Sequence, residues 1–105
     1  MNVASLVSGI FFKTRINNAV EALGDNTFCS TVAEITATNP TIVIVDLEHP
    51  NAPEVIRYFN SKVLAFGPHL RYDLAAISKE FGIQAYPRSV FFNQLETLLR
   101  QSRTS

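Results

Sequence analysis

The stretch TIVIVDLEHP, residues 41–50, decides the fold of this chain. Its first part is apolar or β-branched without alternation, which is typical of a parallel strand covered on both faces. Asp46 falls at the end of that run and is followed by Glu48 and His49. The stretch therefore predicts a buried central strand over residues 41–47 that presents a carboxylate at the rim of the sheet.

Strand-like and helix-like segments alternate through the rest of the chain. Short apolar or β-rich runs predict strands over residues 3–8, 27–32, 62–66 and 84–87. Apolar spacings of three and four predict helices over residues 12–23, 52–59, 74–81 and 91–101, and residues 34–38 form a helix or turn. This alternation predicts an α/β flavodoxin-like, CheY-like three-layer sandwich, in which a five-stranded parallel sheet of order 2-1-3-4-5 carries helices on both faces.

Length and composition are those of one small domain. The chain has 105 residues, of which 47% are hydrophobic and 17% charged, so it can bury one core. We predict a single domain over residues 1–101 and a frayed polar tail over residues 102–105. Nine basic residues balance nine acidic ones, which argues against nucleic-acid binding, because that needs an excess of Lys and Arg. The same balance argues against a membrane-surface role.

Cysteine content and the N-terminal residues bear on the compartment. Cys29 is the single cysteine, so no intramolecular disulfide forms and oxidising export is not supported. The apolar start lacks a basic region before it, and Lys13 and Arg15 follow it directly, which fits neither a signal peptide nor a membrane span. A cytoplasmic location is therefore expected, with Cys29 as a small buried hydrophobe.

Parallel strands end at the same rim of their sheet, so the predicted strand ends gather a set of polar side chains there. The candidate site comprises Lys13, Asp46, Glu48, His49, His69, Arg88 and Ser89. No glycine-rich run precedes a helix at this rim, so FMN or dinucleotide binding is unsupported and no cofactor is expected. The segment FGPH around His69 is either a plain turn or part of a ligand or partner surface.

Asp46 has two interpretations. It is either a phosphoacceptor or a structural acid paired with Arg88, with Lys13 or with backbone donors. An arginine fork beside a carboxylate neutralises it rather than preparing it for phosphorylation. Alternatively, Arg88 makes a contact with an anion or a signalling partner. Ser89 is expected to be the N-cap of the last helix, or else to join that contact.

The layout resembles that of response-regulator receiver domains, the CheY-like proteins, over nearly the whole chain, and the segment IVIVDLEHP resembles the receiver strand that ends in the phosphoacceptor aspartate. More narrowly, a group of small bacterial receiver-like proteins without assigned activity is resembled by the segments GIFFKTRINNAVEALG, TIVIVDL, VLAFGPH and AYPRSVFFNQLETLL. The resemblance implies that Asp46 stands at the phosphoacceptor position. However, receivers hold Mg²⁺ with two acids at the end of the first strand, and residues 7–10 here are Val-Ser-Gly-Ile.

Two further positions depart from the receiver pattern. The hydroxyl residue expected after the fourth strand is replaced by Phe66-Gly67, and Arg88 stands about where receivers have a lysine. We therefore expect a degenerate, non-catalytic pseudo-receiver that acts in signal transduction through protein–protein interaction or self-association. The alternative is an atypical receiver that is phosphorylated on Asp46.

Two lower alternatives remain open. His49 and His69 with Asp46 or Glu48 would suit a transition-metal or ligand sensor, although such histidines more often cap helices or bond to backbone. The stretch KEFGIQAYPRSVFF resembles a thioredoxin segment with Pro87 facing the redox site, which would make the chain a redox-inactive thioredoxin-like domain because it has no C-x-x-C.

The expected interaction surface lies near the C-terminus. By resemblance to receivers, a homodimer or an unknown protein partner would dock on the face formed by the fourth helix, fifth strand and fifth helix. Phe91 and Phe92 point about 100° apart on a helix, so one reaches the core and the other forms a surface with Tyr86 or Leu99, or else both rings are buried.

Overall fold

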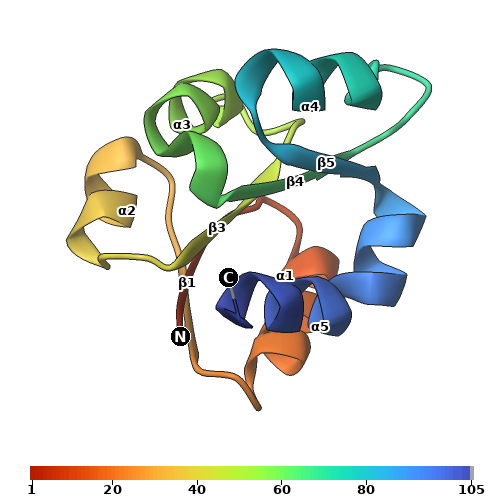
Figure 1. The fold of residues 1–105 in the computed structure, drawn as a ribbon. Helices are drawn as coiled ribbons and strands as arrows, with labels where there is room; N and C mark the ends of the chain where they lie inside the picture. Colours follow the sequence, from red (N-terminus) through yellow and green to blue (C-terminus); the bar gives the residue numbers. More distant parts are fainter. Residues whose placement is uncertain (105) are drawn as a thin grey trace.

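The computed structural model describes residues 1–104 and has a flavodoxin-like fold, with five parallel strands in the order β2-β1-β3-β4-β5 (Figure 1). The elements are β1 (Asn2–Leu6), α1 (Ile10–Val20), β2 (Asp25–Phe28), α2 (Val32–Ala37), β3 (Ile42–Asp46), α3 (Ala52–Phe59), the 3₁₀ turn η1 (Asn60–Lys62), β4 (Val63–Gly67), α4 (Leu74–Phe81), β5 (Gln84–Pro87) and α5 (Arg88–Thr104). The predicted fold class and strand order are confirmed. The all-parallel sheet contradicts the thioredoxin-like alternative.

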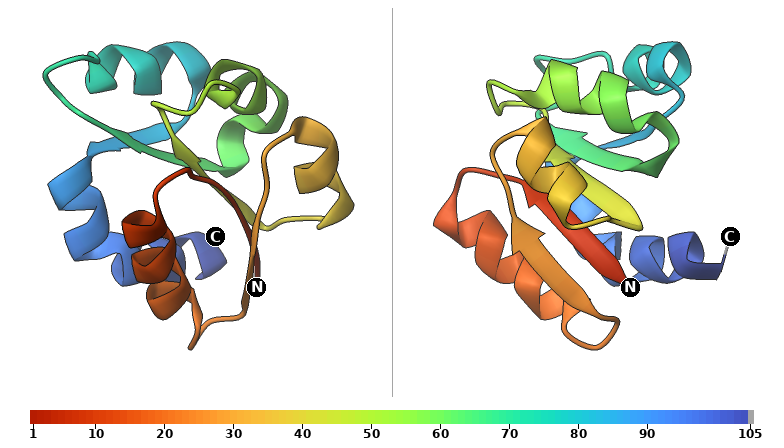
Figure 2. Two further views of the ribbon diagram at one scale, coloured as in Figure 1. Left: turned by 180° about the vertical axis from the view of Figure 1, so that it is seen from behind. Right: turned by 90° about the vertical axis from the view of Figure 1, so that its left-hand side faces the viewer.

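Helices cover both faces of the sheet, as Figures 1 and 2 show: α1 and α5 lie on one face and α2, α3 and α4 on the other. All five residues of β3 are buried. Ile42 and Ile44 pack toward the first pair of helices, whereas Val43 and Val45 pack toward the other three. The lack of apolar alternation in this strand thus reflects two separate cores, one on each face.

Four phenylalanine rings fill the space between the sheet and the α1–α5 pair. Phe66 of β4 stacks on Phe91 with ring centroids 4.8 Å apart, and it meets Phe92 edge-on at 5.0 Å. Phe12 of α1 stacks on Phe92 at 5.2 Å. Both adjacent phenylalanines of α5 are therefore buried, because Phe12 and Phe66 offer partners in both directions.

This burial corrects the expected interface residues. Phe91, Phe92 and Leu99 all belong to the buried core beneath α5, so their side chains do not form a surface. Tyr86 packs partly buried against the same cluster, and its hydroxyl donates to Gln84 Oε1 at 2.8 Å. Whether the face of α4, β5 and α5 mediates dimerisation stays a prediction, and of the four expected residues only Tyr86 keeps exposed surface for it.

Several element boundaries differ from the predicted ones. The second strand covers Asp25–Phe28 rather than residues 27–32, because Thr31 instead caps α2, with its hydroxyl accepting from Glu34 N at 3.2 Å. The last helix begins at Arg88, directly after β5, so Ser89 lies inside its first turn and is not an N-cap. That helix continues to Thr104, so residues 102–104 are helical, whereas Ser105 lies outside the described residues.

Candidate functional site

Asp46 ends β3 at the rim and is only 4% exposed. Its Oδ1 accepts a hydrogen bond from Glu48 N at 2.9 Å, which was one of the three partnerships considered for it. Burial raises the pKa of Asp46, and the Glu48 amide and the nearby Arg88 charge only partly oppose this shift. The carboxyl group is thus held by its own loop in a poorly solvated position.

Glu48, rather than Asp46, is the centre of the ion pairs at this rim. Arg71 Nη1 lies 2.9 Å from Glu48 Oε1 and 3.1 Å from Oε2, and Arg88 Nη2 lies 3.8 Å from Oε1. The Tyr72 hydroxyl lies 3.2 Å from Leu47 O and 3.3 Å from Glu48 Oε2. The contacts of Arg71 and Tyr72 fasten the β4–α4 loop to the β3–α3 loop, and that of Arg88 adds the start of α5. We call this whole set of contacts the Glu48 latch.

Arg88 does not form the ion pair with Asp46 that was one of the alternatives for this acid. Its guanidinium lies over the ring of Phe12, 5.4 Å from the ring centroid, and its ion pair is with Glu48. Its Nε is buried without a hydrogen-bond partner. Arg88 starts α5 next to the aromatic core, so its side chain lies along that apolar surface. Its charge lowers the pKa of Asp46 without a direct ion pair between the two side chains.

Lys13 is also directed away from Asp46. Its Nζ lies over the ring of Phe28, 5.3 Å from the centroid, on the far side of β1 from the Asp46 strand. Ser89 makes no side-chain hydrogen bond with the residues of the described part of the chain. Neither residue therefore joins Asp46 in one polar cluster, although sequence reasoning placed all three at the same rim.

The two histidines lie in different loops of the rim. His49 Nδ1 accepts a hydrogen bond from Asn51 N at 3.1 Å, which makes it part of the turn into α3. His69 is exposed in the β4–α4 loop. Within residues 1–104, no three His, Cys, Asp or Glu side chains gather as metal ligands. The described structure therefore does not bring Asp46, His49 and His69 together as a three-ligand site.

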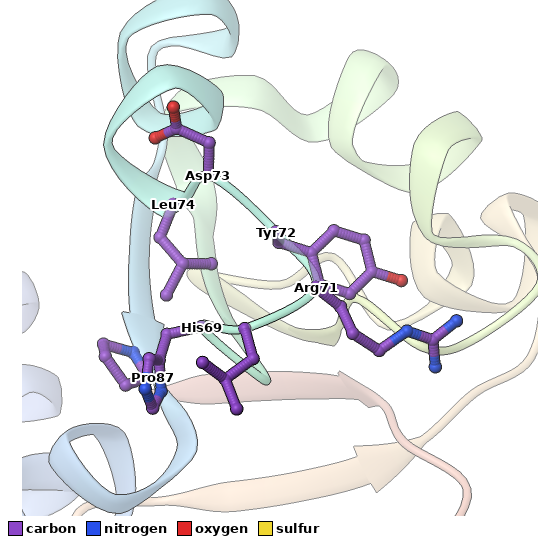
Figure 3. A pocket seen from close by; sticks show the side chains of 7 residues that line it. His69, Arg71, Tyr72, Asp73, Leu74 and Pro87 are labelled. Atoms are coloured by element: carbon purple, nitrogen blue, oxygen red, sulfur yellow. The ribbon is translucent and has the colours of Figure 1, made fainter.

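The loop between β4 and α4 surrounds a shallow hollow of about 570 Å³. Figure 3 shows His69 beside Pro87 at one end, whereas Arg71 points away toward the β3–α3 side. Arg71 N and Tyr72 N both donate to Pro68 O, at 3.0 Å and 3.3 Å, so the segment FGPH begins a tight turn. Gly67 allows this turn to lie close to β3, because a Cβ there would be 3.1 Å from Leu47 Cβ.

Large apolar side chains are exposed at the same rim. Ile10 is 81% exposed, Phe11 65%, Leu70 90% and Val90 37%. They come from the start of α1, the β4–α4 loop and the start of α5. We call these four residues the apolar rim. This surface was not identified from the sequence. The helical spacing does show that Ile10 and Phe11 lie outside the buried face of α1, and this could have indicated that they are exposed.

The end of β1 supplies no acid to the rim. After Leu6 the β1–α1 loop contributes Val7, Ser8 and Gly9, none of which is a carboxylate.

No protein-family model, curated protein or solved structure matches this chain. In the described part of the chain, no helix is both long and apolar enough to cross a membrane. The residues around Asp46 can hold the loops of this rim together, because the ion pairs and hydrogen bonds of the Glu48 latch connect them.

The buried charge of Asp46 leads to a prediction about stability. Asp46→Asn is expected to raise the free energy of unfolding at neutral pH by about 1 kcal/mol, because a neutral amide avoids burying a charge. Its Oδ1 can still accept from Glu48 N. In the wild type, the pKa of Asp46 is raised above its ordinary value of 3.8. The carboxyl group therefore contributes most to the free energy of unfolding below pH 3.8, where it is protonated. That contribution is lost as the pH rises through the raised pKa.

Urea unfolding of both proteins, measured from acidic to neutral pH, tests this prediction. The stability difference between Asp46→Asn and wild type should shrink as the pH falls through the raised pKa. Glu80→Gln, which neutralises an exposed acid on α4, serves as the control and should change little. An Asn variant no more stable than wild type at neutral pH would show that burial does not penalise the Asp46 charge.

Proposed function

We propose that this chain is a pseudo-receiver: a receiver-like module without phosphoryl chemistry that acts in signalling by binding a partner protein. The observation that supports this proposal best is the state of Asp46, which is buried, capped by its own backbone and unaccompanied by an acid from β1. The exposed apolar rim around it supports a docking role. Both features lie at the end of the sheet where flavodoxin-like folds place their functional loops.

Phosphorylation on Asp46 would need an accessible carboxylate oxygen and a bound metal. Phosphoryl transfer depends on positioning and on metal electrostatics, and Mg²⁺ is usually held through carboxylates and phosphate oxygens. Glu48 is the nearest second acid in the sequence, but Arg71 and Arg88 already engage it. The proposal therefore favours a receiver-like module that is not phosphorylated over the atypical phosphorylatable receiver.

The parts of the apolar rim are linked through Phe12, Arg88 and Pro87. The rings of Phe11 and Phe12 meet at 5.8 Å, and Arg88 lies over Phe12. Pro87, which precedes Arg88, lines the same hollow as Leu70. Exposed apolar residues that cluster in this way are characteristic of protein-binding surfaces.

The charges near this surface indicate the kind of partner. Lys13 and Arg15 lie over aromatic rings and form no ion pair with described residues, while Arg71 and Arg88 share the single acid Glu48. A partner segment that combines an apolar side chain with flanking carboxylates would match both the apolar rim and these cations.

Incubation with acetyl phosphate and Mg²⁺, followed by intact-protein mass spectrometry, tests the first half of the proposal. We expect no added phosphoryl group on the wild type under conditions that label an active receiver used as a positive control. Asp46→Ala is the matched variant. A mass gain of one phosphoryl group that disappears in Asp46→Ala would overturn the proposal in favour of the phosphorylatable receiver.

Site-specific photo-crosslinking in cells that produce the protein tests the second half. A photoreactive phenylalanine at Phe11 should give a discrete protein adduct, because that side chain is exposed on the apolar rim. The same probe at Tyr58, an exposed aromatic residue on α3, is the control and should give none. Leu70→Glu should abolish the Phe11 adduct; equal adducts from both positions, or none, would contradict a rim-directed partner.

A further inference from the structure

An apolar groove is lined by residues of α3 and α4. Figure 1 shows these two helices on the face of the sheet opposite α1 and α5. Its volume is about 290 Å³. The groove is lined by Leu47, Ala52, Pro53, Ile56, Arg57, Tyr72, Ile77 and Phe81. It is separate from the apolar rim, and nothing in the proposed function uses it.

The sequence explains why this groove stays open. On the α3 side, Ala52 and Pro53 are too short to reach across to α4. On the α4 side, Ile77 and Phe81 are only partly buried, so they keep apolar surface exposed toward the groove. Leu47 closes the floor beyond the end of β3. The walls are thus almost entirely aliphatic or aromatic.

Two polar side chains line the groove, and only one of them is free. The Tyr72 hydroxyl is already within hydrogen-bonding distance of Leu47 O and Glu48 Oε2. The Arg57 guanidinium, in the last turn of α3, makes no hydrogen bond or ion pair with any residue of the described chain. The groove therefore combines an apolar interior with a single unpaired cation and no competing acid in its lining.

We propose that the groove binds a small hydrophobic monocarboxylate, with its apolar body between α3 and α4 and its carboxylate on Arg57. Small-molecule sites are mostly apolar with a few polar groups that fix orientation, and they usually start at about 300 Å³. The groove is at that lower limit, which suits a small ligand. An arginine with its donors free is well suited to a carboxylate, which it can bind through two hydrogen bonds.

Titration with octanoate, followed by amide chemical shifts in the folded protein, tests the site. Octanoate should bind saturably and shift amides of α3 and α4, while 1-octanol, which has the same chain without the charge, should bind about tenfold more weakly. Arg57→Gln should weaken octanoate binding about tenfold and leave 1-octanol binding unchanged. Lys79→Gln removes a cation of α4 that does not line the groove, so it is the control and should bind as wild type does.

A second variant tests the apolar part independently. Ile77→Trp places a larger ring in the groove at a partly buried position, and it should abolish binding of both octanoate and 1-octanol while the protein remains folded by circular dichroism. The proposal is overturned if octanoate shows no saturation, or if its shifts map outside α3 and α4. It is also overturned if Arg57→Gln binds as tightly as wild type, or if sedimentation shows that Ile77→Trp dissociates a dimer, since a second copy would then be the occupant.

Discussion

Replacing Phe66 with alanine is expected to lower the free energy of unfolding by about 3 to 5 kcal/mol, the range measured for buried aromatic residues cut back to alanine. Phe66 is completely buried in β4, next to the central strand. Its ring contacts Phe91, Phe92 and Phe12 at centroid distances of 4.8, 5.0 and 5.6 Å. Because three other rings are held around it, the surrounding side chains cannot easily collapse into the cavity.

Chemical denaturation of Phe66→Ala and Phe11→Ala provides a matched comparison, since both variants remove the same atoms. Phe11 is 65% exposed, so its replacement should change stability by less than about 0.5 kcal/mol. A domain of this size has a total stability of only about 5 to 15 kcal/mol, so Phe66→Ala should remove a large share of it and shift the unfolding midpoint to a clearly lower denaturant concentration. Equal effects of the two variants would mean that the aromatic cluster is not the main support of the α1–α5 face.

The fold was predictable because it depends on patterns that extend along the chain. The unbroken apolar run of residues 42–45, which Asp46 ends, indicates a strand with two covered faces, and the alternation of strands and helices then leaves few topologies. Boundaries set by single side chains were harder to place. Thr31 begins a helix through one hydrogen bond, and in the sequence it looked like the end of a strand.

The contacts of the candidate site could not be predicted in the same way, since they depend on loop geometry. The rim position of Asp46 followed from the strand pattern, but its expected pairing with Arg88 did not occur. Glu48 instead engages Arg71, which lies 23 positions away in a loop without periodic spacing. Which of several cations reaches an acid depends on how far each loop extends, and local sequence patterns do not encode that distance.

Replacing Phe91 with glutamate is expected to prevent folding, whereas an interface residue at this position would leave the monomer intact. Phe91 is completely buried and stacks on Phe66. The substitution removes an aromatic ring from the core and places a carboxylate where no cation contacts the original ring in the described structure. The two costs together should exceed about 5 kcal/mol, which is comparable with the stability of the whole domain.

The adjacent Val90 is the control for this prediction, because it lies on the same helical turn but is 37% exposed. Val90→Glu should keep the circular dichroism spectrum and cooperative unfolding of the wild type, while Phe91→Glu should lose both. If Phe91→Glu instead remains a folded monomer and the wild type is a dimer, the interface originally expected at Phe91 is correct and the aromatic core is not. The pair therefore separates a core role of α5 from a docking role, because one turn of the helix presents both kinds of surface.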